Sequence, residues 1–321
     1  MARLYVLLTL GLSLALSACA GGARTGLQLV SPYTAELARV SEPYPYPYTA
    51  LHARGGRRLA FVAATHTVDP DSSTMAAIRQ AFDTVRPATV IIEGFPSEMG
   101  ENPEIITEII EQAALPEADP YARGEAAYAA RLAIAAGVPF QGGEPTEAAQ
   151  TRALLAQGFS VRDVFFADLL KVLPQSIRGG EISGTDDARF EEVFARWTVS
   201  LAVERDDAPR IDLDQFAAWY EAQFGVHYRL DARFSDRADP SADTLVGSIL
   251  RAQSLLRDRH LYGVILQAVR ARGRVLVVYG GTHRTTLAPA LSAALGPAEL
   301  WPGPALATAT SAAAASAQAR E

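Results

Sequence analysis

The chain has 321 residues, of which 49% are hydrophobic and 20% are charged, with 24 Gly, 19 Pro and a single Cys. This composition excludes a disordered chain, a collagen-like repeat and a disulfide-rich scaffold. The length allows one large domain or two small ones. A net charge of −7 does not provide the basic surface that nucleic acids require, so nucleic-acid partners are disfavoured.

The N-terminus has the pattern of a secretory signal. Arg3 is followed by the uncharged apolar run 4–16, which is short for a membrane span. Cys19 follows small residues, as in a bacterial lipobox, and it is the only cysteine. We therefore expect residues 1–18 to be a signal peptide and Cys19 to carry a lipid, which would anchor the protein to a membrane, at the outer membrane or cell surface, facing the periplasm or the exterior. An ordinary cleaved signal with an incidental cysteine is the alternative.

Residues 19–50 read as a tether between this lipid and the folded domain. Proline and tyrosine alternate over residues 43–48, and proline favours an extended chain because it fixes φ and has no backbone N–H. A docking motif for an aromatic groove of a partner is the alternative. The tail 305–321 is rich in Ala, Thr, Ser and Gln, and we expect it to be flexible. The folded domain is thus expected at 51–304.

Within that domain, strand patterns alternate with helical ones. Residues 58–64 form a short apolar run, and the helical pattern after it ends at Pro87, before the apolar run 88–93. The later expected elements are helices at 104–114 and 122–136, a strand at 138–141, a helix opening at 145–147, a mostly helical insertion at about 160–243, a helix at about 243–272 and a strand at 274–279. This alternation predicts an α/β fold, with a mainly parallel sheet flanked by helices.

Each expected strand leads into a titratable side chain at its carboxyl end. His66 follows the first strand and Glu93 ends the second. Glu144 follows the third and His283 follows the last. Ligands of open α/β sheets bind beyond these ends, so we expect the four side chains to converge. Two imidazoles and two carboxylates suit zinc, manganese or cobalt, although each residue taken singly is also explained as a helix cap, a solvated loop residue or a hydrogen-bonding group.

Several short motifs resemble those of one superfamily. The segments Ala63-Ala64-Thr65-His66 and Gly280-Gly281-Thr282-His283 are similar to the paired Gly-x-x-His motifs of the TraB/GumN and Tiki superfamily, which is related more remotely to erythromycin esterases and haem-binding ChaN-type lipoproteins. Segments 91–94, 143–150 and 257–259 agree with it in the same order, and the similarity spans most of residues 58–290. Ala63 departs from the first motif, which has Gly there, and this puts the backbone approach near His66 in doubt.

The resemblance implies an extracytoplasmic α/β protein with a metal-dependent hydrolase site for peptide or ester bonds. His66 and His283 would be metal ligands, and Glu93 and Glu144 would be a ligand and a general base, in either order. Arg257 would orient a carboxylate or stabilise an oxyanion. A surface helix charge paired with a nearby carboxylate explains Arg257 equally well.

Two other hypotheses stay open, because related folds host different activities. One is a lipoprotein that binds haem or another metal complex. The other is a metal-free esterase in which His66 or Glu93 is the general base. If the protein is a hydrolase, with or without a metal, we expect a peptide or small-molecule substrate, and we expect the helical insertion to set most of the specificity. The sequence gives no signal for an oligomeric interface.

Overall fold

The structure is a computed structural model, and it describes residues 26–40, 45–112, 120–178, 180–203 and 211–302. The expected signal peptide, Cys19 and the tail 305–321 lie outside the described residues. The chain divides into two units. The first consists of Met1–Ser31, Val40–Glu144 and Asp258–Glu321, and the second consists of Pro32–Arg39 and Pro145–Arg257.

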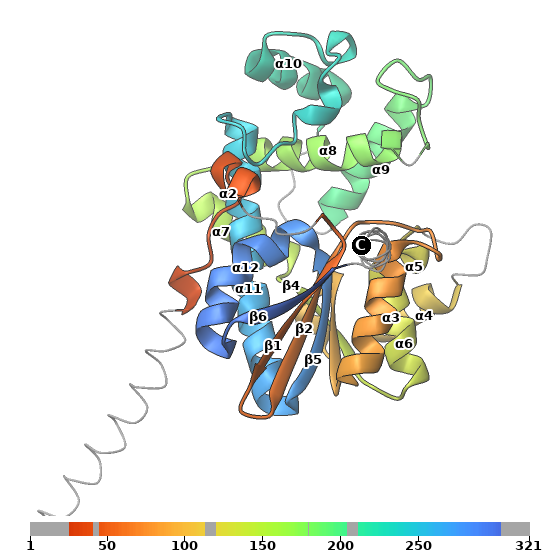
Figure 1. Cartoon of the computed structure of the whole chain (residues 1–321). Helices are drawn as coiled ribbons and strands as arrows, with labels where there is room; N and C mark the ends of the chain where they lie inside the picture. The colour runs from red at the N-terminus through yellow and green to blue at the C-terminus, as the bar shows by residue number, and fades with distance from the viewer. Residues whose placement is uncertain (1–25, 41–44, 113–119, 179, 204–210, 303–321) are drawn as a thin grey trace, which may run out of the picture. The chain divides into compact units, whose positions relative to one another are not determined.

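The first unit is built on a six-stranded sheet with the order β4-β3-β5-β2-β1-β6 (Figure 1). The strands are β1 (Tyr48–Arg54), β2 (Arg57–Ala64), β3 (Thr89–Pro96), β4 (Phe140–Glu144), β5 (Arg274–Gly280) and β6 (Ala298–Pro302). Strands β2, β5, β3 and β4 run parallel, whereas β1 pairs antiparallel with β2 and β6. The expected α/β fold with a mainly parallel sheet is confirmed.

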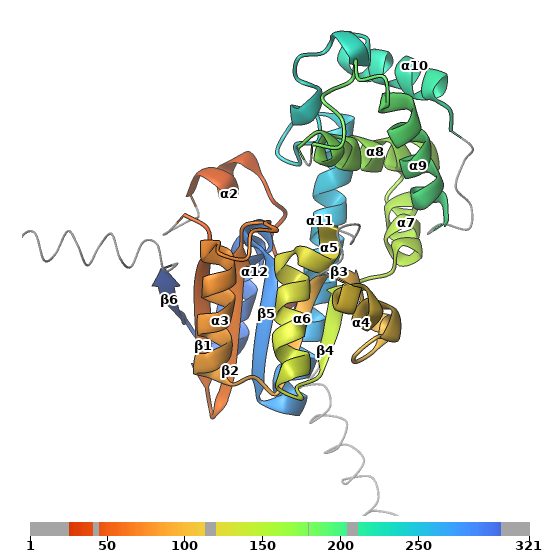
Figure 2. The same ribbon diagram turned by 90° about the vertical axis from the view of Figure 1, so that its right-hand side faces the viewer.

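Helices cover both faces of this sheet, as the continuous burial of its central strands requires. Helices α3 (Ser73–Val85) and α6 (Glu125–Ala135) lie on one face (Figures 1 and 2). They pack against alternate residues of the strands, among them Val62 and Val278. Helix α12 (Gly281–Leu295) lies on the opposite face (Figure 2). The shorter helices of this unit are η1 (Ser97–Met99), α4 (Glu104–Glu111) and α5 (Pro120–Arg123).

The second unit is helical and has an aromatic core. Its elements are α2 (Ala35–Val40), α7 (Glu147–Ala156), α8 (Val161–Arg178), α9 (Phe190–Val203), α10 (Leu213–Phe224), η3 (Tyr228–Leu230), η4 (Phe234–Asp236) and the first part of α11 (Leu245–Arg272). The fully buried ring of Phe216 contacts Phe166, Phe194, Trp219, Tyr220 and Tyr228. The insertion expected at 160–243 thus lies within this larger helical unit.

The structure corrects several expected boundaries. Tyr48 begins β1, so the last three residues assigned to the tether belong to the sheet, and β6 was not expected at all. Strand β4 starts at Phe140 rather than at residue 138, because Pro139 has no N–H to donate and joins the sheet only through its carbonyl, which accepts from Val90. Strand β3 continues past Glu93 to Pro96, with a shift of register on the way.

Candidate active site

The predicted site residues of the first unit lie at the carboxyl edge of the parallel strands. His66 follows β2 by two residues, Glu93 lies in β3, and Glu144 ends β4. His283 is in the first turn of α12, directly after β5. Because β5 lies between β2 and β3, the turn that carries His283 starts between the strands that lead to His66 and Glu93.

Glu93 is held at the start of α12. The pairing of β3 with β4 shifts register between Ile92 and Pro96, and such an irregularity redirects a side chain at the end of a strand. The Gly280 N–H donates to Glu93 Oε2 at 2.7 Å, and Glu93 Oε1 lies 3.4 Å from His283 Nε2. The partial positive charge of the helix N-terminus favours a carboxylate at this place.

His283 is oriented by Asp258, a carboxylate on α11 that is 0% exposed. His283 Nδ1 lies 2.5 Å from Asp258 Oδ1, and the Thr286 hydroxyl donates to Asp258 Oδ2 at 2.7 Å. An ionised carboxylate can only accept, so it is Nδ1 of His283 that carries the proton in this bond. Nε2 is therefore the nitrogen that faces Glu93.

His66 is oriented in the same way by Glu125, the first residue of α6. His66 Nδ1 lies 2.5 Å from Glu125 Oε1, and the Thr67 N–H donates to Glu125 Oε2 at 3.2 Å. The hydrogen bond to Glu125 raises the pKa of His66, and the charge of Glu93 adds to the rise against the opposing effect of desolvation. The side chain of His66 is 71% exposed, whereas that of Glu125 is 11% exposed.

Gly280 marks the point where these groups meet. A Cβ atom at this position would lie 3.2 Å from His66 Nε2 and 3.4 Å from Glu93 Oε2. Both side chains thus lie against the same stretch of backbone, and a residue without a Cβ leaves room for them. The structure therefore brings together His66, Glu93 and His283, from three parts of the sequence.

The other two predicted site residues have different surroundings. Glu144 is 7% exposed, and its register partner in β3 is Pro96, three residues after Glu93. Arg257 is the last residue of the second unit and is half-buried. The residue that the structure joins to His283 is the next one, Asp258.

Sequence reasoning assigned no role to either carboxylate that holds an imidazole, although Asp258 lies in segment 257–259, which resembles the superfamily. Asp258 precedes the buried residues Leu261 and Tyr262 by three and four positions, so it is a charge on the apolar stripe of its helix, and that pattern was the available signal. Glu125 had no such signal. An acidic residue in the first turn of a helix is ordinary, because the helix dipole favours it.

A metal centre is not preformed among these groups. In the ranges that the structure describes, no set of three or more His, Cys, Asp or Glu side chains is arranged to hold a metal ion. The carboxylate at Nδ1 of each imidazole is nevertheless the arrangement that metal-binding histidines use to fix their tautomer. Ligation by His66, Glu93, Glu144 and His283 stays a prediction.

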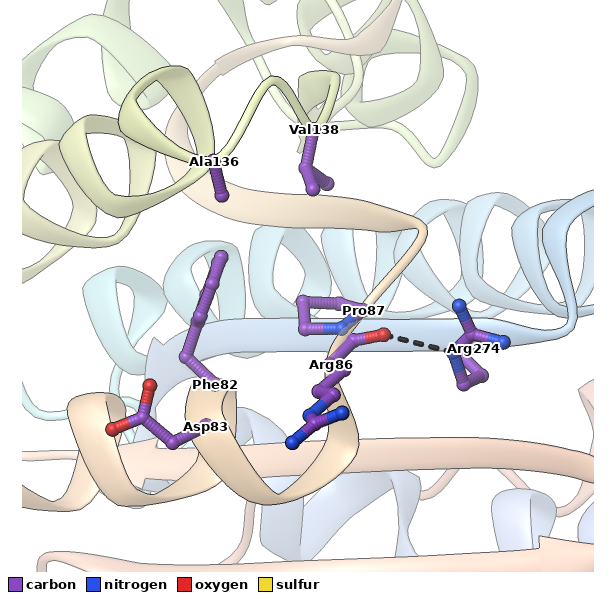
Figure 3. Close-up of a pocket in the computed structure, with 7 residues that line it drawn as sticks. All are labelled: Phe82, Asp83, Arg86, Pro87, Ala136, Val138 and Arg274. Atoms are coloured by element: carbon purple, nitrogen blue, oxygen red, sulfur yellow. Dashed lines mark hydrogen bonds between the residues drawn. The ribbon is translucent and has the colours of Figure 1, made fainter.

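A hollow of about 510 Å³ lies at the other edge of the sheet (Figure 3). It is lined by Phe82, Asp83, Arg86, Pro87, Ala136, Val138 and Arg274. Arg274 begins β5, and its Nε donates to the Arg86 carbonyl at 2.8 Å (Figure 3). The hollow therefore lies at the amino ends of the strands, whereas ligands of open α/β sheets bind at the carboxyl ends.

Comparisons with protein-family models, with curated proteins and with solved structures find no match for the chain. Among the described helices, none has the length and apolar character needed to span a bilayer.

Proposed function

We propose that the chain is a hydrolase that cleaves a peptide or ester bond at the site formed by His66, Glu93 and His283. One observation carries the proposal. Each of two imidazoles has a carboxylate at Nδ1, and His283 Nε2 lies 3.4 Å from Glu93, a carboxylate that is bonded to a backbone N–H. His66 Nε2 and Glu93 Oε2 both lie within 3.4 Å of the place that a Cβ atom of Gly280 would take. Side chains that hydrogen bonds hold in place beside a carboxylate can transfer protons to and from a reacting water.

The three groups take different roles in this proposal. Glu93 is the general base, because the Gly280 N–H holds it at the carboxyl edge of the sheet, where it can accept a proton from water. His66 is the general acid for the leaving group, because it is the exposed imidazole and its raised pKa favours the protonated form. His283 is the buried partner of Glu93 and shares the proton that Glu93 accepts.

A divalent metal ion is the second form of the proposal, and the contact between His283 and Glu93 favours it. When neutral His283 carries its proton on Nδ1, the Nε2 lone pair faces Glu93 Oε1 at 3.4 Å. Two facing acceptors need a proton or a cation between them. Bound manganese, cobalt or zinc would polarise a carbonyl and lower the pKa of a water. Since no three described donors converge, we assign no step to the metal.

We also propose that Cys19 is lipidated and holds the protein at the outer membrane or cell surface, facing the periplasm or the exterior. The signal pattern before Cys19 supports this proposal. We expect the mass of the N-terminal peptide to include a lipid, and we expect Cys19→Ser to move the protein from the membrane fraction to the aqueous fraction. An N-terminal peptide without lipid would contradict it.

The test of the hydrolase uses full-length protein that is purified without chelator. A panel of peptides and p-nitrophenyl esters is offered to the parent, to His66→Asn, Glu93→Gln and His283→Asn, and to the control His227→Asn, which changes a histidine of the second unit. We expect losses of about 100-fold or more in the three site variants and none in the control. A folded parent that cleaves nothing, or site variants that keep the parent rate, would contradict the proposal.

The metal content of the same samples separates its two forms. Activity that persists after chelation, in protein free of metal, supports the acid–base form. Stoichiometric manganese, cobalt or zinc in the parent, lost from His283→Asn and Glu93→Gln together with activity, supports the metal-dependent form.

A further inference from the structure

The chain just before β1 packs against the helix that carries His283. The ring of Tyr46 lies where a side chain of Gly281 would be, since a Cβ atom there would come 2.1 Å from Tyr46 Cε1 and 2.3 Å from Tyr46 Cζ. Gly281 is the first residue of α12 and directly follows Gly280, whose N–H holds Glu93. The ring therefore contacts the turn that carries both His283 and the N–H that is bonded to Glu93.

Two further contacts fix the ring of Tyr46. Its hydroxyl lies 3.1 Å from Thr285 Oγ1, on the first turns of α12. Its other neighbour is Tyr48, with the two rings stacked at 5.8 Å and only 10° from parallel. Tyr48 is 3% exposed and pairs in the sheet with Ala63 of β2. Tyr46 thus links the sheet to the start of α12.

An earlier part of the same stretch contacts α12 one residue further on. The Ser31 N–H donates to the Thr286 carbonyl at 3.3 Å, and the Thr286 hydroxyl donates to Asp258. Asp258 in turn holds His283. Tyr46 and Ser31 both lie in the expected tether 19–50. Tyr46 contacts the turn before His283, and Ser31 contacts Thr286, whose hydroxyl is bonded to Asp258.

We propose that Tyr46 is a positioning residue for the reaction at His66, Glu93 and His283. The inference rests on the proposed function. The ring holds the first turn of α12, so that the Gly280 N–H stays on Glu93 and His283 Nε2 stays opposite Glu93 Oε1. Removal of the ring leaves a space beside Gly281 into which this turn can move, and small displacements of reacting groups cost large factors in rate.

The first experiment compares full-length parent, Tyr46→Ala, Tyr46→Phe and the control Pro45→Ala, which alters an exposed residue of the same segment. For Tyr46→Ala we expect kcat to fall by about tenfold with KM changed less than about twofold. The imidazole ¹⁵N resonances of His283 should shift in the same variant. Tyr46→Phe keeps the ring and should retain most of kcat, and Pro45→Ala should match the parent. Unchanged kcat and unchanged His283 resonances in folded Tyr46→Ala would overturn the inference.

The second experiment uses the close approach at Gly281. Gly281→Ala places a methyl group where the ring lies, so it should lower the melting temperature and shift the His283 resonances when Tyr46 is present. In Tyr46→Ala the space is vacant, so adding Gly281→Ala should cause little further change. Effects that simply add in the double variant would contradict the inference. This cycle needs no substrate, so a parent without hydrolase activity would remove the proposed function while the cycle still decided whether Tyr46 positions His283.

Discussion

Asp258→Asn is the substitution that isolates the orientation of His283. The side chain keeps its shape and loses its charge, in a place where it is 0% exposed and accepts two hydrogen bonds, from His283 Nδ1 at 2.5 Å and from the Thr286 hydroxyl at 2.7 Å. An amide can also donate to Nδ1, which would move the imidazole proton to Nε2, opposite Glu93.

The expected loss follows from the hydrogen bond to His283. A hydrogen bond to a charged group contributes about 1.5–3 kcal/mol, and Asp258 stabilises the imidazolium form of His283 most when that form arises in the transition state. A loss of about 3 kcal/mol of transition-state stabilisation corresponds to about 150-fold in kcat/KM at 1.36 kcal/mol per factor of ten. The Thr286 bond changes from charged to neutral and mainly affects stability.

The assay is kcat/KM on the best substrate of the peptide and ester panel, with circular dichroism and cooperative unfolding as checks of the fold. The ¹⁵N shifts of His283 report its tautomer independently of turnover. A folded Asp258→Asn protein with the parent kcat/KM and an unchanged His283 tautomer would refute the assignment of Asp258 as the group that orients His283.

Three other substitutions test separate parts of the structure. Burial is the main cause that lowers the pKa of His52, a strand residue bonded to the Gly296 carbonyl, so its protonation is disfavoured in the folded state. The stability that neutral His52 contributes is fully present above about pH 6.5 and is lost as the pH falls toward the lower folded pKa. His52→Asn should therefore weaken the dependence of the free energy of unfolding on pH below about 6.5, as measured by urea titrations, and the same dependence in parent and variant would contradict this. Gly280 has a φ of −51°, which alanine also adopts, but the methyl group of Gly280→Ala would lie 3.2 Å from His66 Nε2. The rate of hydrolysis should therefore fall by about tenfold or more with the fold intact, and full activity would show that the space beside Gly280 is not needed. Phe216→Ala should lower the unfolding free energy of the second unit by about 3–5 kcal/mol in denaturant titrations, because its ring is fully buried among five others, and a loss below about 1 kcal/mol would be too small for such a core position.

The parallel part of the sheet could be predicted because its signals are local. Apolar runs that alternate with helical patterns fix the order of strands and helices along the chain. That order predicts a parallel sheet, in which the carboxyl ends of the strands lie at one edge. His66, Glu93 and His283 were therefore found at one edge without any knowledge of the pairing. The same reasoning located the helical insertion, since Phe216 and Tyr220 share one helical face and both are buried.

The antiparallel edge of the sheet was missed for a different reason. The alternation of proline and tyrosine before β1 favours an extended spacer, so the hairpin pattern that follows it was not used. In that hairpin, Gly55 and Gly56 both take positive φ in a tight turn between β1 and β2. Strand β6 is short and ends at Pro302, so its pattern is weak.

The carboxylates at Nδ1 of the two histidines could be predicted only in part. Asp258 and His283 are joined by the packing of two helices, and Glu125 meets His66 through the position of a helix start. Both contacts depend on tertiary geometry that local patterns do not contain. The apolar stripe that carries Asp258 indicates a buried charge, and a buried charge needs a partner, but the local pattern does not identify that partner.

The most direct test of the shared site is the rate of hydrolysis by the parent, Glu93→Gln, His283→Asn and the variant that carries both changes, each shown to be folded. If the two side chains act as one unit, each single change lowers kcat/KM by about 100-fold or more, and the double variant is no slower than the slower single variant. Losses that multiply in the double variant, or a double variant that keeps the parent rate, would contradict the account.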